Sequence, residues 1–293
     1  MALDIINDPR QITSYLPERL YKFRFWESQL HKDVLEKQHF YFSTPPQLWS
    51  VGDKDDCLFP IEFPKTPEDI YAVLAAMPDP NHWSAGMTDA ERRRARWQQA
   101  HLNSDPVSLA QREKAYYKNQ NEKLRVLSLT KRFDNEAMWD DSTYGSFSKG
   151  FCVGIDPREL IYEIFNTGIT GNPCEYVPRG SSPIKYAFYS VDGPEASIEM
   201  GLQHLHMKYD DFSQEEEYRF VKRYHDQRYP KGVTESDFYL PVPKSAFKEV
   251  YIGYQLPKEE IQEIKDTCAR HELSVDFYKA QPDGKGGIQV TLL

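Results

Sequence analysis

Three groups of residues combine ligand-binding or reactive side chains with the ends of short apolar segments. Arg24 lies near the end of the first segment, Ser43 lies at the end of the next, and Glu215 and Glu217 stand where a late segment begins. An arginine guanidinium holds phosphate through its planar fork, and a serine hydroxyl both donates and accepts hydrogen bonds. Carboxylates at positions i and i+2 of a strand point to the same side. Together these side chains predict a site for an anionic ligand that contains a sugar.

The segments around Arg24 and Ser43 are predicted to form a strand, a helix and a second strand. Residues 19–24 alternate in the manner of a strand. Residues 26–37 bring leucine and valine side chains to one stripe of a helix. Residues 40–42 are aromatic, which favours a strand, and two prolines end this run soon afterwards. The strand ends therefore present Arg24 and Ser43.

Residues 60–123 are predicted to form a helical insertion within a single domain that spans residues 1–293. Three sequence patterns in this range are typical of a helix N-terminus. Thr66 precedes a proline, Thr88 is followed three residues later by Glu91, and Asp105 precedes a second proline. Threonine and aspartate are favoured N-cap residues, and proline is favoured at the first helical position. Thr88 and Glu91 also match a capping box.

This insertion carries one apolar stripe and one basic stretch. Because apolar residues at helical spacing need a surface to cover them, we expect the first helix to pack on the sheet. Its contact residues would be Ile70, Val73, Leu74 and Met77. The basic stretch Arg92–Arg96 should stay exposed, as charge runs usually do.

Strands are predicted again after the insertion, which indicates an α+β fold with a mixed or split β-sheet core and flanking helices. A further helix is predicted to begin after Pro257. No glycine-rich turn joins a strand to a helix, which argues against a Rossmann or P-loop enzyme. The predicted strands are residues 125–130, 150–155, 160–165, 175–177, 217–224, 248–253, 273–278 and 288–292.

Composition excludes several classes of protein. The chain has 36 Lys and Arg against 45 Asp and Glu, a formal net charge of −9, which disfavours a surface coated with positive charge for nucleic acid. No apolar run is long enough for a membrane span, and the N-terminus does not resemble a signal peptide. Four widely spaced cysteines are typical of free thiols in a reducing compartment. We therefore expect a cytoplasmic protein without a membrane partner.

Several short stretches spread over much of the chain form a common pattern: Leu20-Tyr-Lys-Phe-Arg24, Tyr41-Phe-Ser43, Leu127-Ser-Leu129 with Asn135 and Met138-Trp139, Gly150-Phe-Cys-Val-Gly154, Phe212 with Glu215-x-Glu217-Tyr-Arg219, and Tyr251-Ile-Gly253. In these stretches the chain resembles a bacterial family known as domain of unknown function 2971. The family label itself implies no activity. Two places depart from the family pattern: residues 46–53 replace the usual Asn-Asp-Pro turn after the second strand, and Phe212 stands where members often have tryptophan.

Arg24, Ser43 and the Glu215-x-Glu217 pair also resemble the arginine–serine–glutamate triad of ADP-ribosyltransferases. That family consists of split-sheet α+β enzymes that cleave NAD. The resemblance implies an enzyme that consumes NAD as co-substrate without a metal, of the toxin or phage-defence kind. It also implies a nucleic-acid or protein acceptor and a partner protein in a defence or toxin–antitoxin system.

The resemblance assigns a role to each candidate residue. Glu217 would stabilise the positive charge that develops on the ribose as the nicotinamide bond breaks, and Glu215 would orient or deprotonate the acceptor. Because two neighbouring carboxylates disfavour joint ionisation, we expect one pKa to be raised. Arg24 would clamp a phosphate and Ser43 would fix the nicotinamide half. Aromatic rings would stack on the ligand, with Tyr21 and Tyr41 as the candidates.

Two other classes of function remain open. In the first, the protein is a non-catalytic module that binds a nucleotide or a protein, and Arg24 and Glu217 form a structural ion pair. In the second, the acidic cluster belongs to a metal-dependent nuclease. His204 and His206 are two residues apart and do not share a helix face, so we do not expect a histidine metal site.

Overall fold

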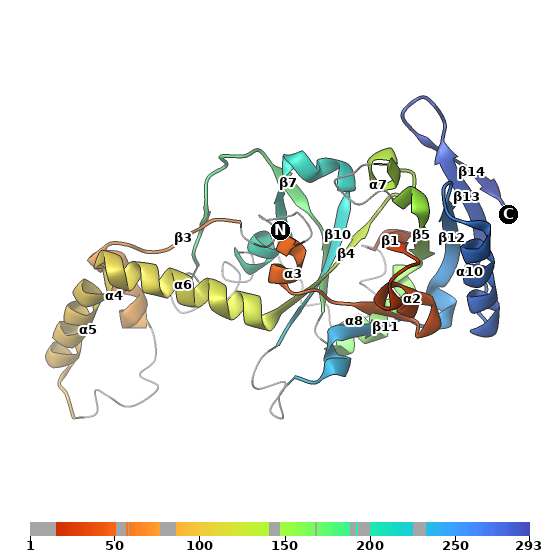
Figure 1. The fold of residues 1–293 in the computed structure, drawn as a ribbon. Coiled ribbons are helices and arrows are strands. Elements are labelled where there is room, and N and C mark those ends of the chain that lie inside the picture. Colours follow the sequence, from red (N-terminus) through yellow and green to blue (C-terminus); the bar gives the residue numbers. More distant parts are fainter. Residues whose placement is uncertain are drawn as a thin grey trace.

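An eight-stranded mixed sheet forms the centre of the fold, with helices around it, which confirms the predicted α+β class. Figure 1 shows the sheet running across the molecule, with a group of helices extending to one side. This computed structural model describes residues 16–50, 57, 59–76, 86–140, 147–167, 169–187, 192, 200–224 and 233–293.

The strands of the large sheet lie in the order β14-β13-β12-β5-β1-β4-β10-β6, and only the pairing of β12 with β13 is parallel. Three two-stranded sheets join β2 to β11, β3 to β8 and β7 to β9. The strands are β1 Leu20–Phe25, β2 His39–Tyr41, β3 Ile61–Glu62, β4 Leu124–Thr130, β5 Gly150–Ile155, β6 Thr170–Pro173, β7 Glu175–Val177, β8 Ile184–Lys185, β9 Met207–Tyr209, β10 Glu217–Arg223, β11 Tyr239–Pro241, β12 Phe247–Gly253, β13 Asp276–Pro282 and β14 Ile288–Leu292. The α-helices are α2 Gln29–Glu36, α3 Pro45–Ser50, α4 Pro67–Ala76, α5 Asp89–Asn103, α6 Pro106–Lys123, α7 Glu136–Asp140, α8 Ile161–Thr167 and α10 Lys258–Arg270.

The middle of the sheet is buried on both faces. Every residue of β5 is buried, and its side chains alternate between two apolar clusters. Phe151 and Val153 belong to the main core, which also takes side chains from α2 and α10, whereas Cys152 belongs to an aromatic cluster on the other face. This double coverage holds β1, the neighbour of β5, in a fixed position.

The sheet splits between β1 and β4. All six residues of β1 pair with β5, but only Tyr21 has a partner on β4, Thr130. Further along β4, Val126 instead exchanges two main-chain hydrogen bonds of 2.8 Å with Ser43. The loss of pairing leaves an opening between β1 and β4, and the side chains in it come from both strands.

The helical insertion has the predicted helices and caps. The Thr88 side chain accepts from the main-chain N–H of Glu91, and the Glu91 side chain accepts in return from the main-chain N–H of Thr88, so the capping box is confirmed. Asp105 accepts from the first turn of α6. That residues 1–293 form a single domain stays a prediction.

One prediction about the insertion was wrong: α4 packs against α5 and not on the large sheet. The Tyr71 ring stacks on Trp97 of α5 at 4.5 Å, and Figure 1 shows α4 and α5 far from the eight strands. Ile70 and Val73 are buried, Leu74 is half-buried, and Met77 lies outside the described residues. Arg93 and Arg94 are exposed as expected. Arg92 and Arg96 are half-buried, paired with Asp89 and the Ala75 carbonyl respectively.

The strand predicted for residues 160–165 was also wrong, because the chain there is helical. Asp156 caps the start of this region by accepting from the N–H of Arg158, and Pro157 occupies the first helical position of a 3₁₀ turn that continues into α8. A short apolar run fits a strand and a buried helix equally well. The cap and the proline decide in favour of the helix.

Candidate functional site

The opening between β1 and β4 contains a cavity of about 130 Å³. Four of the six predicted site residues line it: Tyr21, Arg24, Glu215 and Glu217. The cavity therefore brings together the arginine and the two glutamates from parts of the chain nearly two hundred residues apart. The remaining lining residues are Lys22, Phe23, Ser128, Leu129, Thr130, Met138 and Phe147.

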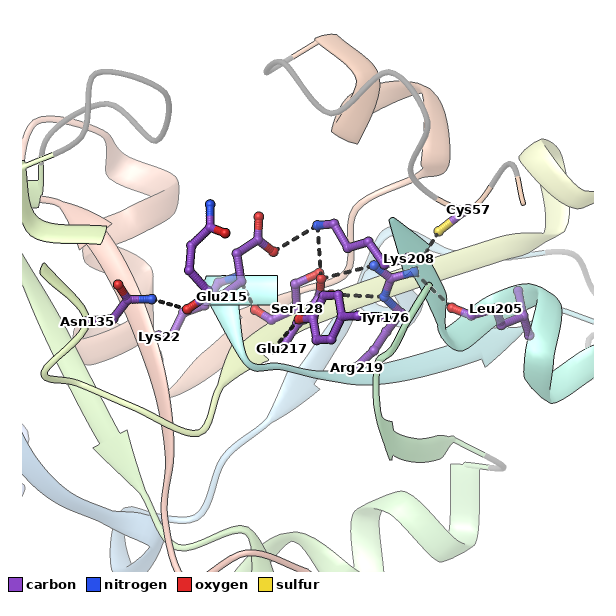
Figure 2. A network of polar contacts seen from close by, with 11 residues as sticks. Lys22, Cys57, Ser128, Asn135, Tyr176, Leu205, Lys208, Glu215, Glu217 and Arg219 are labelled. Atoms are coloured by element: carbon purple, nitrogen blue, oxygen red, sulfur yellow. Dashed lines mark hydrogen bonds and ion pairs between the residues drawn. The ribbon is translucent and has the colours of Figure 1, made fainter. Parts of the chain in front are cut away.

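On the β10 side, Glu217 is held in a buried ion-pair network, which Figure 2 shows. Its carboxylate accepts two hydrogen bonds from the Arg219 guanidinium, at 2.9 Å from Nε and 3.0 Å from Nη2. The Lys208 ammonium lies 3.2 Å from the same carboxylate. Arg219 has no exposed side-chain surface, and Glu217 has 3%. Both oxygens of Glu217 therefore have cationic partners.

The raised pKa expected for one of the two glutamates is not found at Glu217. Burial by itself would raise the pKa of Glu217. The positive charges of Arg219 and Lys208, together with hydrogen bonds from Arg219 and Ser128, outweigh burial and hold this pKa well below its usual value. Glu217 is therefore a fixed anion. The non-catalytic interpretation had predicted an ion pair between Glu217 and Arg24. The arginine that pairs with Glu217 is instead Arg219.

Glu215 shares Lys208 with Glu217 but is less enclosed. The Lys208 ammonium lies 2.8 Å from Glu215 Oε2, and 14% of the Glu215 side chain is exposed. Glu215 ends the 3₁₀ turn Asp210–Glu215, and Asn135 donates to the carbonyl of Gln214 beside it. Figure 2 shows Lys208 between the two carboxylates. Glu215 is thus the more accessible carboxylate of the pair.

On the β1 side, Lys22 reaches across the opening. Its ammonium donates to the main-chain carbonyl of Ser128, at a point where β1 and β4 share no ladder pair among the described residues. Burial lowers the pKa of Lys22 well below its usual value, and the charge of Arg24 lowers it further, against the opposing charges of Glu217 and Glu215. A neutral carbonyl is therefore the hydrogen-bond acceptor of this half-buried lysine.

Arg24 has no carboxylate partner in the described structure. Its Nη1 donates to the Phe23 carbonyl at 3.3 Å, and its Nε is buried without a hydrogen-bond partner. Burial lowers the pKa of Arg24 to about 10, so the guanidinium keeps its charge at neutral pH. Its charge also helps burial to lower the pKa of the nearby His31 to about 4.

The charges around the opening do not balance. Lys208 and Arg219 neutralise Glu215 and Glu217 through the ion pairs described above. Lys22 and Arg24 remain, and neither has an ion pair with a described residue. Both side chains are half-buried, and a charge that is partly removed from water without a partner is costly. The opening therefore favours an anion that would accept hydrogen bonds from the Arg24 guanidinium and the Lys22 ammonium.

Of the three other residues predicted to contact the ligand, one lines the cavity and two do not. Tyr21 lines the cavity, but its ring packs edge-on against Phe133 and Tyr251 at 5.5 and 6.0 Å, so it is a wall and not an open stacking surface. Ser43 pairs with β4 at Val126 and does not line the cavity. Tyr41 lies on β2 against Tyr239, also away from the cavity.

The structure adds no support to the metal-dependent nuclease. Within the described part of the chain, no three His, Cys, Asp or Glu residues are grouped as a metal site requires. His204 and His206 are buried, and the Nδ1 of each donates to a main-chain carbonyl, that of Phe59 and of Leu202 respectively. All four cysteines are buried. No helix among the described residues has the length and apolar character needed to cross a membrane.

No family model, no curated protein and no solved structure matches this chain. The resemblances to the domain of unknown function 2971 family and to ADP-ribosyltransferases stay predictions.

Three residues of the site were missed at the sequence level: Lys22, Lys208 and Arg219. Two of them could have been recognised from their positions in the sequence. Lys22 is a charged residue between two buried aromatic residues, Tyr21 and Phe23. Arg219 follows Glu217 by two residues, which places both on one face of β10. Lys208 has no such signal, because its position depends on how β9 packs.

Proposed function

We propose that this protein binds a small anionic ligand of the nucleotide class in the opening between β1 and β4. Arg24 and Lys22 would bind a phosphate group of that ligand. The observation that carries the proposal is the Arg24 guanidinium, which lines the cavity with a buried, unpartnered Nε and no carboxylate beside it. A planar fork of this kind matches two phosphate oxygens at once.

The size of the cavity limits how much of the ligand it encloses. A water molecule takes up ~30 Å³ in the liquid, so a cavity of about 130 Å³ has room for one phosphate or one sugar but not for a complete dinucleotide. The rest of a nucleotide would lie outside the opening. Apolar walls from Phe23, Met138 and Phe147 would strengthen the charged contacts by excluding water.

Calorimetric titration with ADP-ribose, inorganic pyrophosphate and adenosine tests the binding proposal. We expect the two phosphate compounds to bind and adenosine to bind much more weakly. Arg24→Met should weaken ADP-ribose binding by about 10-fold or more, the size of one charge-assisted hydrogen bond. Arg93→Met, which removes an exposed arginine on α5, is the matched control and should leave the affinity unchanged. Equal affinities for ADP-ribose and adenosine, or an unchanged affinity in Arg24→Met, would refute the proposal.

A second candidate function is cleavage of NAD, because Glu215 lines the same cavity as Arg24. A carboxylate near a bound ribose stabilises the oxocarbenium-like charge of the transition state. Glu217 had been expected in that role, but its oxygens are engaged by Arg219 and Lys208. Glu215 is the better placed carboxylate because it is more exposed. A toxin or phage-defence role, and a nucleic-acid or protein acceptor, would follow from this activity.

Release of nicotinamide from NAD by the purified protein tests this second function. If Glu215 stabilises the transition state, Glu215→Gln should lower the rate by on the order of 10²-fold and change NAD affinity far less. The control is Glu216→Gln, because Glu216 is adjacent but pairs with Arg132 at the surface. Binding of NAD without release of nicotinamide would leave the non-catalytic binding module as the function.

A further inference from the structure

Within the part of the chain that the structure describes, each of the two outer strands of the large sheet has one edge without a paired strand, and the two edges differ in how well they are protected. The edge strand β6 has four residues and includes Gly171 and Pro173, both of which discourage a further strand from pairing. At the other edge, β14 reads Ile-Gln-Val-Thr-Leu from Ile288 to Leu292. It contains no charge, no proline and no glycine. An edge strand of this composition is a ready template for pairing with another chain.

The hydrogen-bonding groups on the open edge of β14 can be assigned from its pairing with β13. The N–H of Leu293 donates to the Phe277 carbonyl, and the Gly287 carbonyl accepts from the N–H of Asp283. In an antiparallel ladder, hydrogen-bonded residues alternate with residues whose N–H and C=O groups point the other way. Residues 287, 289, 291 and 293 therefore face β13. Residues 288, 290 and 292 direct their main-chain groups to the open edge.

The same three residues also form an apolar row on one face of the sheet. Val290 lies opposite Ala280, and Leu292 lies opposite Tyr278, whose ring stacks on Tyr251 in the aromatic cluster. The relative exposure is 37% for Val290 and 67% for Leu292. The apolar surface of this sheet face thus continues outward to the open edge and remains exposed there.

We propose that β14 pairs with β14 of a second copy of this chain, antiparallel and around a twofold axis at Val290. Val290 is the middle residue of β14 and its main-chain groups point outward, so an axis there gives the longest overlap of the two strands. Val290 then faces Val290 of the second copy, and Ile288 faces Leu292 on either side. The two eight-stranded sheets become continuous, and the two apolar rows meet on one face.

A second copy fits this edge better than an unrelated chain because the strand is complementary to itself. Each of its outward residues offers one donor and one acceptor, and the twofold operation matches them in pairs. Each chain carries a net charge of −9, so two copies repel one another over most of their surfaces. The uncharged edge of β14 is a place where that repulsion is weak.

Cysteine cross-linking tests the register. Val290→Cys places two thiols across the axis, where paired residues have Cα atoms about 5.5 Å apart, within the range that a disulfide spans. Mild oxidation should produce a disulfide-linked dimer. Thr291→Cys is the matched control: residue 291 would face residue 289 of the second copy, and its side chain points to the other sheet face, so it should not cross-link. The four native cysteines are buried.

Analytical ultracentrifugation of the unmodified protein supplies a test that needs no variant. We expect dimers whose fraction rises with concentration, and monomers at the same concentrations for Val290→Lys. A monomer at every concentration, or equal cross-linking of Val290→Cys and Thr291→Cys, would overturn the proposal. A dimer that persists in Val290→Lys would also overturn it, because the interface would then lie elsewhere.

Discussion

The two walls of the opening carry the same kinds of cation in opposite electrostatic settings. On and beside β10, Arg219 and Lys208 are paired with Glu217 and Glu215 at 2.8–3.2 Å. On β1, Arg24 and its neighbour Lys22 donate side-chain hydrogen bonds to main-chain carbonyls and, among the described residues, to no carboxylate. The β10 wall is therefore complete by itself, whereas the β1 wall has positive charge that no described residue neutralises.

This difference assigns a separate role to each wall of the cavity: the ion pairs beside β10 stabilise the fold, and the cations of β1 are available to bind a ligand. A buried ion pair with both partners present is stable in place but costs several kcal/mol when one partner is removed. A half-buried cation without a partner, such as Arg24, has the opposite property: its removal relieves an unfavourable loss of hydration, while a bound anion supplies the missing partner. Residue type alone does not distinguish the two cases, because both walls offer an arginine and a lysine.

The largest effect on stability should come from disrupting the ion pairs of Glu217 beside β10. Glu217→Gln removes the charge that Arg219 and Lys208 surround, so we expect a loss of about 3–5 kcal/mol in the free energy of unfolding, measured by urea denaturation. Glu216→Gln should cost no more than about 1 kcal/mol, because its pairing with Arg132 is at the surface. Similar stabilities for the two variants would mean that the network around Glu217 is not structural.

A smaller effect is expected from the titration of Lys22. Because the pKa of Lys22 is lowered, its charged form is lost at a lower pH than that of an ordinary lysine, whose pKa is about 10.4. An anion binds the charged form, so affinity for sulfate should fall as pH rises through this lowered pKa. We expect a decrease of about 10-fold. Lys22→Arg, which keeps its charge, should show a flatter pH profile, and equal profiles would exclude Lys22 from the site.

Much of the fold follows from local signals in the sequence. The caps at Thr88 and Asp105 and the alternation in β1 and β10 mark elements that depend on neighbouring residues only. The region 160–165 was misjudged because its apolar spacing does not separate a strand from a buried helix. The packing of α4 on α5 depends on tertiary contacts such as Tyr71 with Trp97, which no local pattern specifies.

The site was only partly accessible to sequence reasoning, for a similar reason. Arg24, Glu215 and Glu217 could be selected by residue type and by their position at strand ends, and they do line one cavity. Which cation pairs with which carboxylate depends on the splitting of β1 from β4 and on the position of β9. Both are long-range features. Ser43 could not be placed for the same reason, since it occupies the side of β4 that β1 leaves.

The unfolding of Arg24→Met, with and without ADP-ribose, tests the central claim most directly. Without ligand, the variant should be as stable as the unmodified protein or more stable, because methionine replaces a half-buried cation whose buried Nε lacks a partner. ADP-ribose should raise the free energy of unfolding of the unmodified protein and leave that of the variant nearly unchanged. A loss of about 3 kcal/mol or more in the variant without ligand would contradict the account, because Arg24 would then be a structural ion-pair partner like Arg219.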